Sequence, residues 1–238
     1  MASGAQNQVR AFRKCAYLCI VKCELVIFDL DGTLIDTIAD LGAAVNEALG
    51  AKGLPLRRPE EFRGMVGHGV RNLVRRAMPE ALQADEALLD SLLADFIRYY
   101  LDHIDDRSHP YPGIPELLGA LSGTGVRFAV ASNKFQSGTE KLIRRLFPGL
   151  SFAAICGGLP ARPLKPDAAI VRDIWEQTGA RPEATVLVGD SRTDIATARA
   201  AGIPCVAVTW GFRPEADLLA ADRIAHSPGE LREILLEK

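Results

Sequence analysis

Short, almost continuous apolar runs alternate with amphipathic helical patterns over most of the chain, and this alternation limits the possible folds most strongly. The runs cover residues 25–28, 126–131, 152–156, 185–188 and 205–208, with a weaker run at 222–225. Apolar residues at helical spacing separate the runs, over residues 115–121, 139–147, 167–177, 193–200 and 214–219. Strands that are apolar on both faces and joined by helices form a parallel sheet with helices on both sides. The sequence therefore predicts an α/β fold with a Rossmann-like parallel sheet.

A different pattern interrupts this alternation after the first run. Between residues 36 and 107 the apolar residues recur at helical spacing, as in Leu41, Val45 and Leu49. Residues 108–113, with the sequence SHPYPG, break that periodicity and lead back to the alternating pattern. We expect an inserted helical domain and an α/β core domain, preceded by an N-terminal extension of unknown role: residues 36–107, residues 24–35 with 108–238, and residues 1–23.

Composition and charge argue against several classes of partner. The 238 residues include 28 Lys and Arg against 30 Asp and Glu, a balance that does not predict the basic surface needed to bind nucleic acid. No apolar run reaches the ~18 residues that a membrane-spanning helix requires. Five cysteines, an odd number, suit a reducing compartment. We therefore expect a cytoplasmic protein, monomeric or homodimeric, without nucleic-acid or membrane partners.

Polar side chains follow the apolar runs, at the edge where an open parallel sheet binds its ligands. They supply carboxylate, hydroxyl, amide and ammonium groups: Asp29, Asp31, Ser132, Asn133, Lys165 and Asp190. Carboxylates gathered in one pocket repel each other unless a divalent cation lies among them, and a ligand set of oxygens favours Mg²⁺. Lys165 and Ser132 would add a charge and a hydroxyl donor for a phosphate. Such a set suits phosphoryl transfer, in which a carboxylate can act as the nucleophile.

Four short motifs at these positions resemble those of the haloacid dehalogenase-like (HAD) hydrolase superfamily. They are residues 29–34 (DLDGTL), 132–133 (SN), 165–167 (KPD) and 189–194 (GDSRTD). Their order and spacing fit the superfamily, and four ordered motifs at predicted strand ends are a strong signal. The long gap between the first two motifs holds the helical insert, where the superfamily carries its first type of cap domain. The resemblance extends from about Leu25 to the C-terminus.

The resemblance implies a catalytic role for several of these residues. Asp29 would attack phosphorus, while Asp31 would protonate the leaving group and later accept a proton from water. Lys165 would complete the catalytic set. Mg²⁺ would be held by Asp29, the backbone carbonyl of Asp31, Asp190 and Asp194, the last directly or through water.

The resemblance also implies a substrate class. Ser132, Asn133, Lys165 and Gly32 would bind the phosphate, and the acid at Asp31 separates phosphatases from the superfamily members that break carbon–halogen bonds. The layout is similar to that of the phosphoglycolate phosphatases, for example in residues 132–134 (SNK) and 209–211 (TWG). A Mg²⁺-dependent phosphatase is therefore implied, acting on a small phosphorylated metabolite through an aspartyl phosphate.

A glycine-rich segment of the insert, residues 63–69 (RGMVGHG), suits close approach of the backbone to a ligand. We expect it to face the active site, with Arg63, His68 or Arg71 contacting the leaving group of the substrate.

Other interpretations stay open at this point. A sugar-phosphate phosphomutase would share all four motifs and differ in how its cap binds a second phosphate. A non-catalytic, phosphate-binding regulatory module would keep the fold without turnover. Taken singly, Ser132 also suits a helix cap, and Asp190 and Asp194 suit the N-terminus of a helix.

Overall fold

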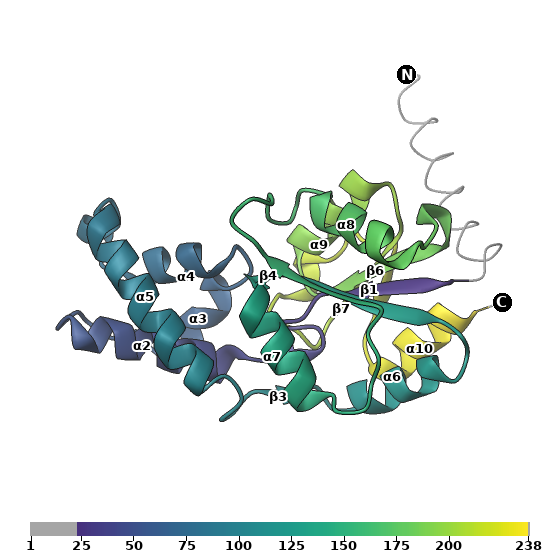
Figure 1. Cartoon of the computed structure of the whole chain (residues 1–238), viewed down its shortest axis with the longest axis horizontal. Coiled ribbons are helices and arrows are strands. Elements are labelled where there is room, and N and C mark those ends of the chain that lie inside the picture. Colours follow the sequence, from purple (N-terminus) through teal and green to yellow (C-terminus); the bar gives the residue numbers. More distant parts are fainter. Residues whose placement is uncertain (1–22, 238) are drawn as a thin grey trace, which may run out of the picture.

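Six parallel strands form the central sheet of the computed structural model, which describes residues 23–237 (Figure 1). In spatial order they are β5 (Ala154–Gly158), β4 (Arg127–Phe135), β1 (Leu25–Phe28), β6 (Thr185–Gly189), β7 (Cys205–Val208) and β8 (Arg223–Ala225). Every pair of neighbours in this sheet is parallel. The predicted fold class is confirmed.

Alternate residues of β1 face opposite sides of the sheet, and both sides are covered (Figure 1). Leu25 and Ile27 belong to the apolar core beneath α8 (Ala169–Thr178) and α9 (Arg192–Ala201). Val26 and Phe28 belong to the core on the other face, which is covered by α6 (Ile114–Ser122), α7 (Gln136–Leu146) and α10 (Pro228–Leu236). Burial on both faces explains why the run is apolar at every position.

Four further helices lie together beside the sheet (Figure 1): α2 (Ile38–Ala51), α3 (Pro59–Met65), α4 (Val70–Ala77) and α5 (Glu86–Asp102), with a 3₁₀ turn at Glu80–Leu82. The two chain crossings that lead to and from these helices pair as short antiparallel strands, β2 (Ile35–Asp36) and β3 (His109–Pro110). Buried Asp40 of α2 accepts hydrogen bonds from the backbone N–H groups of Arg107 and Ser108, at 2.9 and 2.7 Å. The two crossings are thereby held next to each other.

Several elements differ from the sequence predictions. Residues 214–219 contain only a 3₁₀ turn at Glu215–Asp217, because Leu218 is their single buried apolar residue while Leu219 stays 70% exposed. Helix α10 was not predicted. The strand expected to end at Ala131 continues as β4 to Phe135, with a shift in its pairing with β5 between these two residues.

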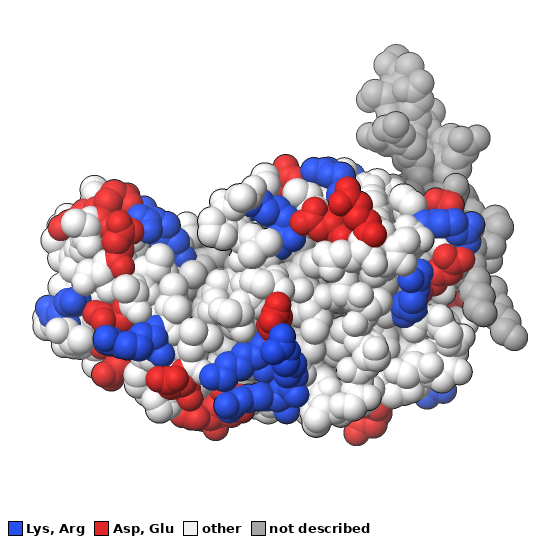
Figure 2. All heavy atoms as spheres, viewed as in Figure 1, with Lys and Arg blue, Asp and Glu red and all other residues white. Residues whose placement is uncertain are grey.

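The surface agrees with the near-neutral composition. On the face shown in Figure 2, acidic and basic side chains adjoin each other, and the basic group that lies over α7 has acidic side chains next to it. Among residues 23–237, no helix is both long and apolar enough to cross a membrane. The N-terminal extension, apart from Cys23, lies outside the described residues.

Candidate active site

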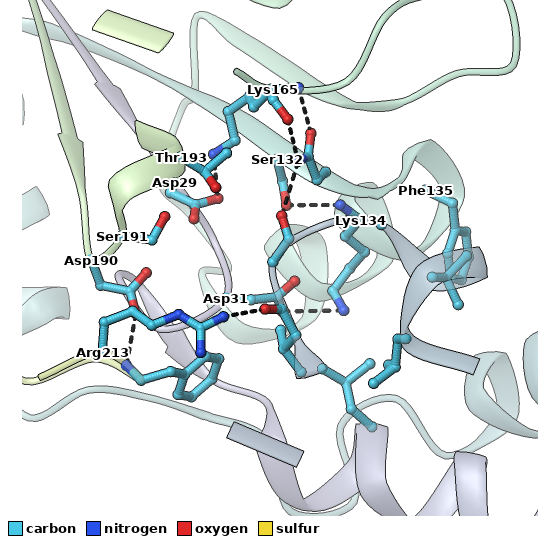
Figure 3. Close-up of a pocket in the computed structure, with 18 of the residues that line it drawn as sticks. Asp29, Asp31, Ser132, Lys134, Phe135, Lys165, Asp190, Ser191, Thr193 and Arg213 are labelled. Carbon is cyan, nitrogen blue, oxygen red and sulfur yellow. Dashed lines mark hydrogen bonds and ion pairs between the residues drawn. The ribbon is translucent and has the colours of Figure 1, made fainter. Parts of the chain in front are cut away.

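A cavity of about 50 Å³ lies at the carboxyl edge of the sheet, between the strand ends and the helices α2, α4 and α5 (Figure 3). Its polar lining comes from the loops after β1, β6 and β7, the end of β4, the loop before α8 and the first turn of α9: Asp29, Asp31, Ser132, Asn133, Lys134, Lys165, Asp190, Ser191, Thr193 and Arg213. The structure therefore brings the predicted strand-end residues together, although they are spread over more than half of the chain.

Three carboxylates form one acidic group at the base of this cavity. Oxygens of Asp29, Asp190 and Asp194 all lie within 4.8 Å of one another. Burial, reinforced by the charge of Asp194, raises the pKa of Asp29 well above its usual range. The same two causes raise the pKa of Asp190 to about 7. A cation bound by these oxygens would offset that repulsion, and an all-oxygen donor set fits Mg²⁺.

Two local structures fix the members of this acidic group. Asp190 follows β6 directly, and its Oδ2 accepts the backbone N–H of Phe212 at 2.7 Å. Asp194 lies in the first turn of α9, where its Oδ2 accepts the backbone N–H of Ser191 at 3.2 Å as part of a capping box. The same oxygen accepts the Ser191 hydroxyl at 2.6 Å. Asp194 thus accepts hydrogen bonds at the N-terminus of α9 and also lies close to the carboxylates of Asp29 and Asp190.

Lys165 is buried against the acidic group and is not a solvated loop residue. Its Nζ lies 2.6 Å from Asp194 Oδ1 and 2.9 Å from Asp29 Oδ1, and its side chain is 2% exposed. Burial alone would lower the pKa of Lys165, but the charges of Asp194 and Asp29 outweigh it and raise that pKa. Lys165 therefore carries its positive charge into the site.

The Asp31 carboxylate lies apart from the acidic group (Figure 3). Its Oδ1 accepts the Thr37 hydroxyl at 2.6 Å and lies 3.1 Å from Nζ of Lys134. Lys134 also donates to the Tyr100 hydroxyl of α5 at 2.9 Å. Despite its burial, Lys134 has a raised pKa because Asp31 and Tyr100 favour the charged form. Neither Lys134 nor Tyr100 was predicted as a site residue, although Lys134 directly follows the SN motif.

Ser132 and Asn133 occupy the irregular end of β4 but offer different groups to the cavity. Ser132 Oγ accepts the backbone N–H of Lys134 at 3.1 Å, which leaves its hydroxyl proton available to a ligand. Asn133 Oδ1 accepts the N–H of Lys165 at 2.8 Å, and its Nδ2 donates to the carbonyls of Lys165 and Gly67, both at 3.0 Å. The Asn133 amide thus bridges two loops, and its predicted contact with phosphate stays a prediction.

Gly32, a predicted phosphate contact, has a structural part in the turn after β1. Its N–H donates to the Ile35 carbonyl at 2.9 Å, and it has a φ of +90°. A Cβ at this position would overlap the Asp190 carboxylate. Gly32 therefore forms the turn after β1 and leaves room for Asp190.

We expect Gly32→Ala to lower the free energy of unfolding by about 1–3 kcal/mol, through backbone strain, and to displace Asp190. Phosphate release should fall by about tenfold or more because the acidic group is disturbed. The control is Gly149→Ala, since Gly149 has a φ of +85° and no atom lies within 4 Å of the place that an added methyl group would take. Urea unfolding and activity assays should show strain in both variants but loss of activity only at Gly32; equal activities would contradict this role.

The glycine-rich segment of the insert faces the cavity, but the three side chains expected there do not line it. Val66, Gly67 and Gly69 are lining residues. Arg71 instead pairs with Glu86 and Asp90 of α5, at 2.7 and 2.5 Å.

The other two expected side chains also lie elsewhere. The Arg63 guanidinium lies 5.9 Å from the centre of the Phe212 ring, and His68 is exposed. The cation that reaches the cavity here is Arg213, which donates to the backbone carbonyls of Arg63 and Val66. No motif pointed to Arg213, which lies just beyond the TWG sequence.

Comparison with known proteins agrees with this geometry. The family model of haloacid dehalogenase-like hydrolases matches residues 26–208. The chain belongs to this family. Phosphoglycolate phosphatase of Agrobacterium fabrum is 36% identical over 218 residues, which cover 89% of this chain and 94% of the relative. The Mesorhizobium japonicum enzyme of the same name is 39% identical over 189 residues, or 79% of this chain and 83% of the relative.

Solved structures with a similar fold agree with membership of this family. A predicted phosphoglycolate phosphatase from Haemophilus somnus superimposes with a TM-score of 0.82 at 28% identity, covering 90% of this chain and 99% of that one. A CbbY variant from Rhodobacter sphaeroides, in complex with xylulose-1,5-bisphosphate, gives a TM-score of 0.73 at 26% identity, covering 88% and 96%. The predicted family is confirmed, and the chain is a hydrolase similar to enzymes that cleave phosphoric monoesters.

Proposed function

We propose that this protein is a Mg²⁺-dependent phosphatase that hydrolyses a small phosphomonoester, such as phosphoglycolate, through an aspartyl phosphate at Asp29. The observation that carries the proposal is the acidic group of Asp29, Asp190 and Asp194 around Lys165, at the base of a cavity that Asp31 also lines. The similarity to relatives named phosphoglycolate phosphatase supports the substrate class.

The charge of the acidic group favours a divalent cation. Three carboxylates and one ammonium group leave a formal excess of two negative charges in a buried place. Such an excess is costly unless a cation offsets it. Asp29, Asp190 and Asp194 would hold Mg²⁺, together with the backbone carbonyl of Asp31. When bound, Mg²⁺ would offset the negative charge of the phosphate oxygens.

In the first step, a carboxylate oxygen of Asp29 forms a bond to phosphorus while the bond from phosphorus to the leaving-group oxygen breaks. Asp31 donates its proton to that oxygen, so the leaving group departs as an alcohol. Asp29 is held for this attack because its Oδ1 accepts the N–H of Leu30 at 2.7 Å and lies 2.9 Å from Lys165 Nζ. Asp31 comes from the same turn but lies apart from the acidic group, as an acid toward the leaving group requires.

In the second step, a water oxygen forms a bond to phosphorus and the bond from phosphorus to Asp29 breaks. Asp31, now a carboxylate, takes a proton from that water, and the products are inorganic phosphate and the original enzyme. The Ser132 hydroxyl and the Lys165 ammonium would hold phosphate oxygens in both steps, where charge develops.

The size of the cavity favours a small leaving group. About 50 Å³ of space corresponds to roughly four water molecules, and Val70, Leu73 and Phe96 bound it on the side of the insert. We propose residues 36–107 as a cap domain that closes this space, and residues 24–35 with 108–238 as the core. A phosphomutase would need a second phosphate site, and the α4 cations Arg71 and Arg75 are already paired with carboxylates.

The test is phosphate release from a panel of esters that includes phosphoglycolate, glucose 6-phosphate and AMP, with Mg²⁺ and with EDTA. We expect release from phosphoglycolate that requires the metal. Transfer of phosphate to a sugar monophosphate instead of water would identify a mutase. A folded protein that releases phosphate from no ester would favour the regulatory module.

A further inference from the structure

We propose that Lys134 binds an anionic group carried by the leaving group of the substrate. Lys134 would then be the residue through which the enzyme prefers phosphate esters of small hydroxy acids, such as phosphoglycolate, to phosphate esters of neutral alcohols. This inference rests on the proposed phosphatase function and assigns its substrate preference to one side chain.

The position of Lys134 follows from its contact with the proposed acid. Lys134 Nζ lies 3.1 Å from Asp31 Oδ1. To receive the proton of Asp31, the leaving-group oxygen has to lie within hydrogen-bond distance of the same carboxyl. In the ester of a 2-hydroxy acid, the carboxylate carbon is only two bonds from that oxygen. A carboxylate at this place would therefore lie beside the Lys134 ammonium.

The Lys134 ammonium also has an N–H donor that can bind an anion. It carries three N–H donors, and the contacts that the described residues make account for two: Asp31 Oδ1 and the Tyr100 hydroxyl at 2.9 Å. The Tyr100 ring lies beneath the ammonium, with its centre 4.7 Å from Nζ. The Lys134 side chain is 3% exposed and yet lines the cavity. A buried ammonium in this setting binds an anion more strongly than an exposed lysine does.

The other two cations of the cavity are placed for different tasks. Lys165 lies between Asp29 and Asp194, on the side where the phosphate would bind (Figure 3). The guanidinium of Arg213 donates to the backbone carbonyls of Arg63 and Val66, so it joins the core to the insert. Among the described residues, Lys134 is thus the cation that directly contacts Asp31, the proposed acid.

The discriminating experiment compares kcat/KM for phosphoglycolate with kcat/KM for 2-hydroxyethyl phosphate, which has a hydroxyl in place of the carboxylate. We expect the wild-type protein to prefer phosphoglycolate. Lys134→Met should lower the ratio of the two values roughly ten- to hundredfold, and Lys134→Arg should restore part of it. Tyr100→Phe, which removes one partner of the ammonium, should lower the ratio less than Lys134→Met does.

Arg213→Met serves as the matched control, since it removes another cation of the cavity. It should lower both values of kcat/KM by a similar factor and leave their ratio unchanged. A purely structural role of Lys134 would also lower both values together, so an unchanged ratio in Lys134→Met would overturn the proposal. A ratio that falls in Arg213→Met but not in Lys134→Met would overturn it as well, as would a wild-type protein without preference.

Failure of the proposed function gives a different result in the same experiment. If the folded wild-type protein with Mg²⁺ released phosphate from neither ester, the phosphatase proposal would fail and the role of Lys134 would fail with it. Release from both esters with a ratio that Lys134→Met does not change would remove the role of Lys134 alone. Thermal unfolding of each variant establishes that it is folded.

Discussion

Replacing Asp29 with asparagine is expected to lower kcat for phosphate release by about 10⁴-fold or more. The amide has nearly the shape of the carboxylate but cannot form the acyl phosphate, so the chemical step is lost while the local contacts are kept. The oxygen of the new amide would still accept the N–H of Leu30, which Asp29 Oδ1 accepts at 2.7 Å.

The stability of this variant separates loss of chemistry from loss of fold. Burial and the charge of Asp194 raise the pKa of Asp29, which means that its charged form is unfavourable in the folded protein without metal. We therefore expect the Tm of Asp29→Asn in EDTA to equal or exceed that of the wild-type protein.

The control for this variant is Asp36→Asn. Asp36 lies in β2, where its Oδ1 accepts the N–H of Ile38 at 3.1 Å, and it does not line the cavity. The Asp36→Asn variant should keep kcat within about threefold of the wild-type value. If Asp29→Asn kept more than about a hundredth of the wild-type kcat, Asp29 would not be the nucleophile.

Removal of divalent cations is expected to abolish activity and to make stability fall as the pH rises. The pKa of Asp190 is raised to about 7 by burial and by Asp194, from a usual value of 3.8. Between about pH 4 and pH 7, the folded state therefore binds more protons at this group than the unfolded state. The contribution of Asp190 to the free energy of unfolding is fully present below about pH 4 and is lost as the pH rises through about 7. This contribution is on the order of a few kcal/mol.

The measurement is the Tm of the protein with Mg²⁺ and with EDTA, at about pH 5 and at about pH 8. We expect Mg²⁺ to raise the Tm more at the higher pH, where the acidic group is charged. Asp190→Asn should weaken both the effect of Mg²⁺ and its dependence on pH. An equal effect of Mg²⁺ at both pH values would contradict a metal site at this carboxylate.

The parts of the site that the sequence predicts share one property, which is their place at the ends of clear apolar runs. Asp29 and Asp190 follow strands that are buried on both faces, so the position of the strand end fixes where each carboxylate lies. Parallel strands then bring the two ends to one edge of the sheet, whatever the length of the insert.

The parts that escape prediction depend on contacts between segments far apart in the chain. Tyr100 contacts Lys134 because α5 packs beside the end of β4. The apolar periodicity of a helix does not predict which of its residues contacts a segment far away in the sequence. Arg213 reaches the carbonyl of Val66 from a loop without a motif. The roles of Gly32 and Asn133 depend on hydrogen bonds that a motif does not specify.

Helix α10 is a different case, because its signal is present in the sequence. Ser227 caps the helix by accepting the N–H of Glu230 at 3.2 Å, and Pro228 occupies the first turn. A serine followed by proline and then by an acidic residue is a typical helix start.

The central claim is a covalent bond between phosphorus and Asp29, and trapping that bond tests it most directly. The wild-type protein is mixed with phosphoglycolate and Mg²⁺, quenched with acid during turnover and treated with borohydride, which reduces an aspartyl phosphate to homoserine. Peptide mass spectrometry should then find homoserine in place of Asp29, with none in samples that lack substrate. Turnover that continues while Asp29 stays unmodified, or modification of another carboxylate instead, would contradict the account.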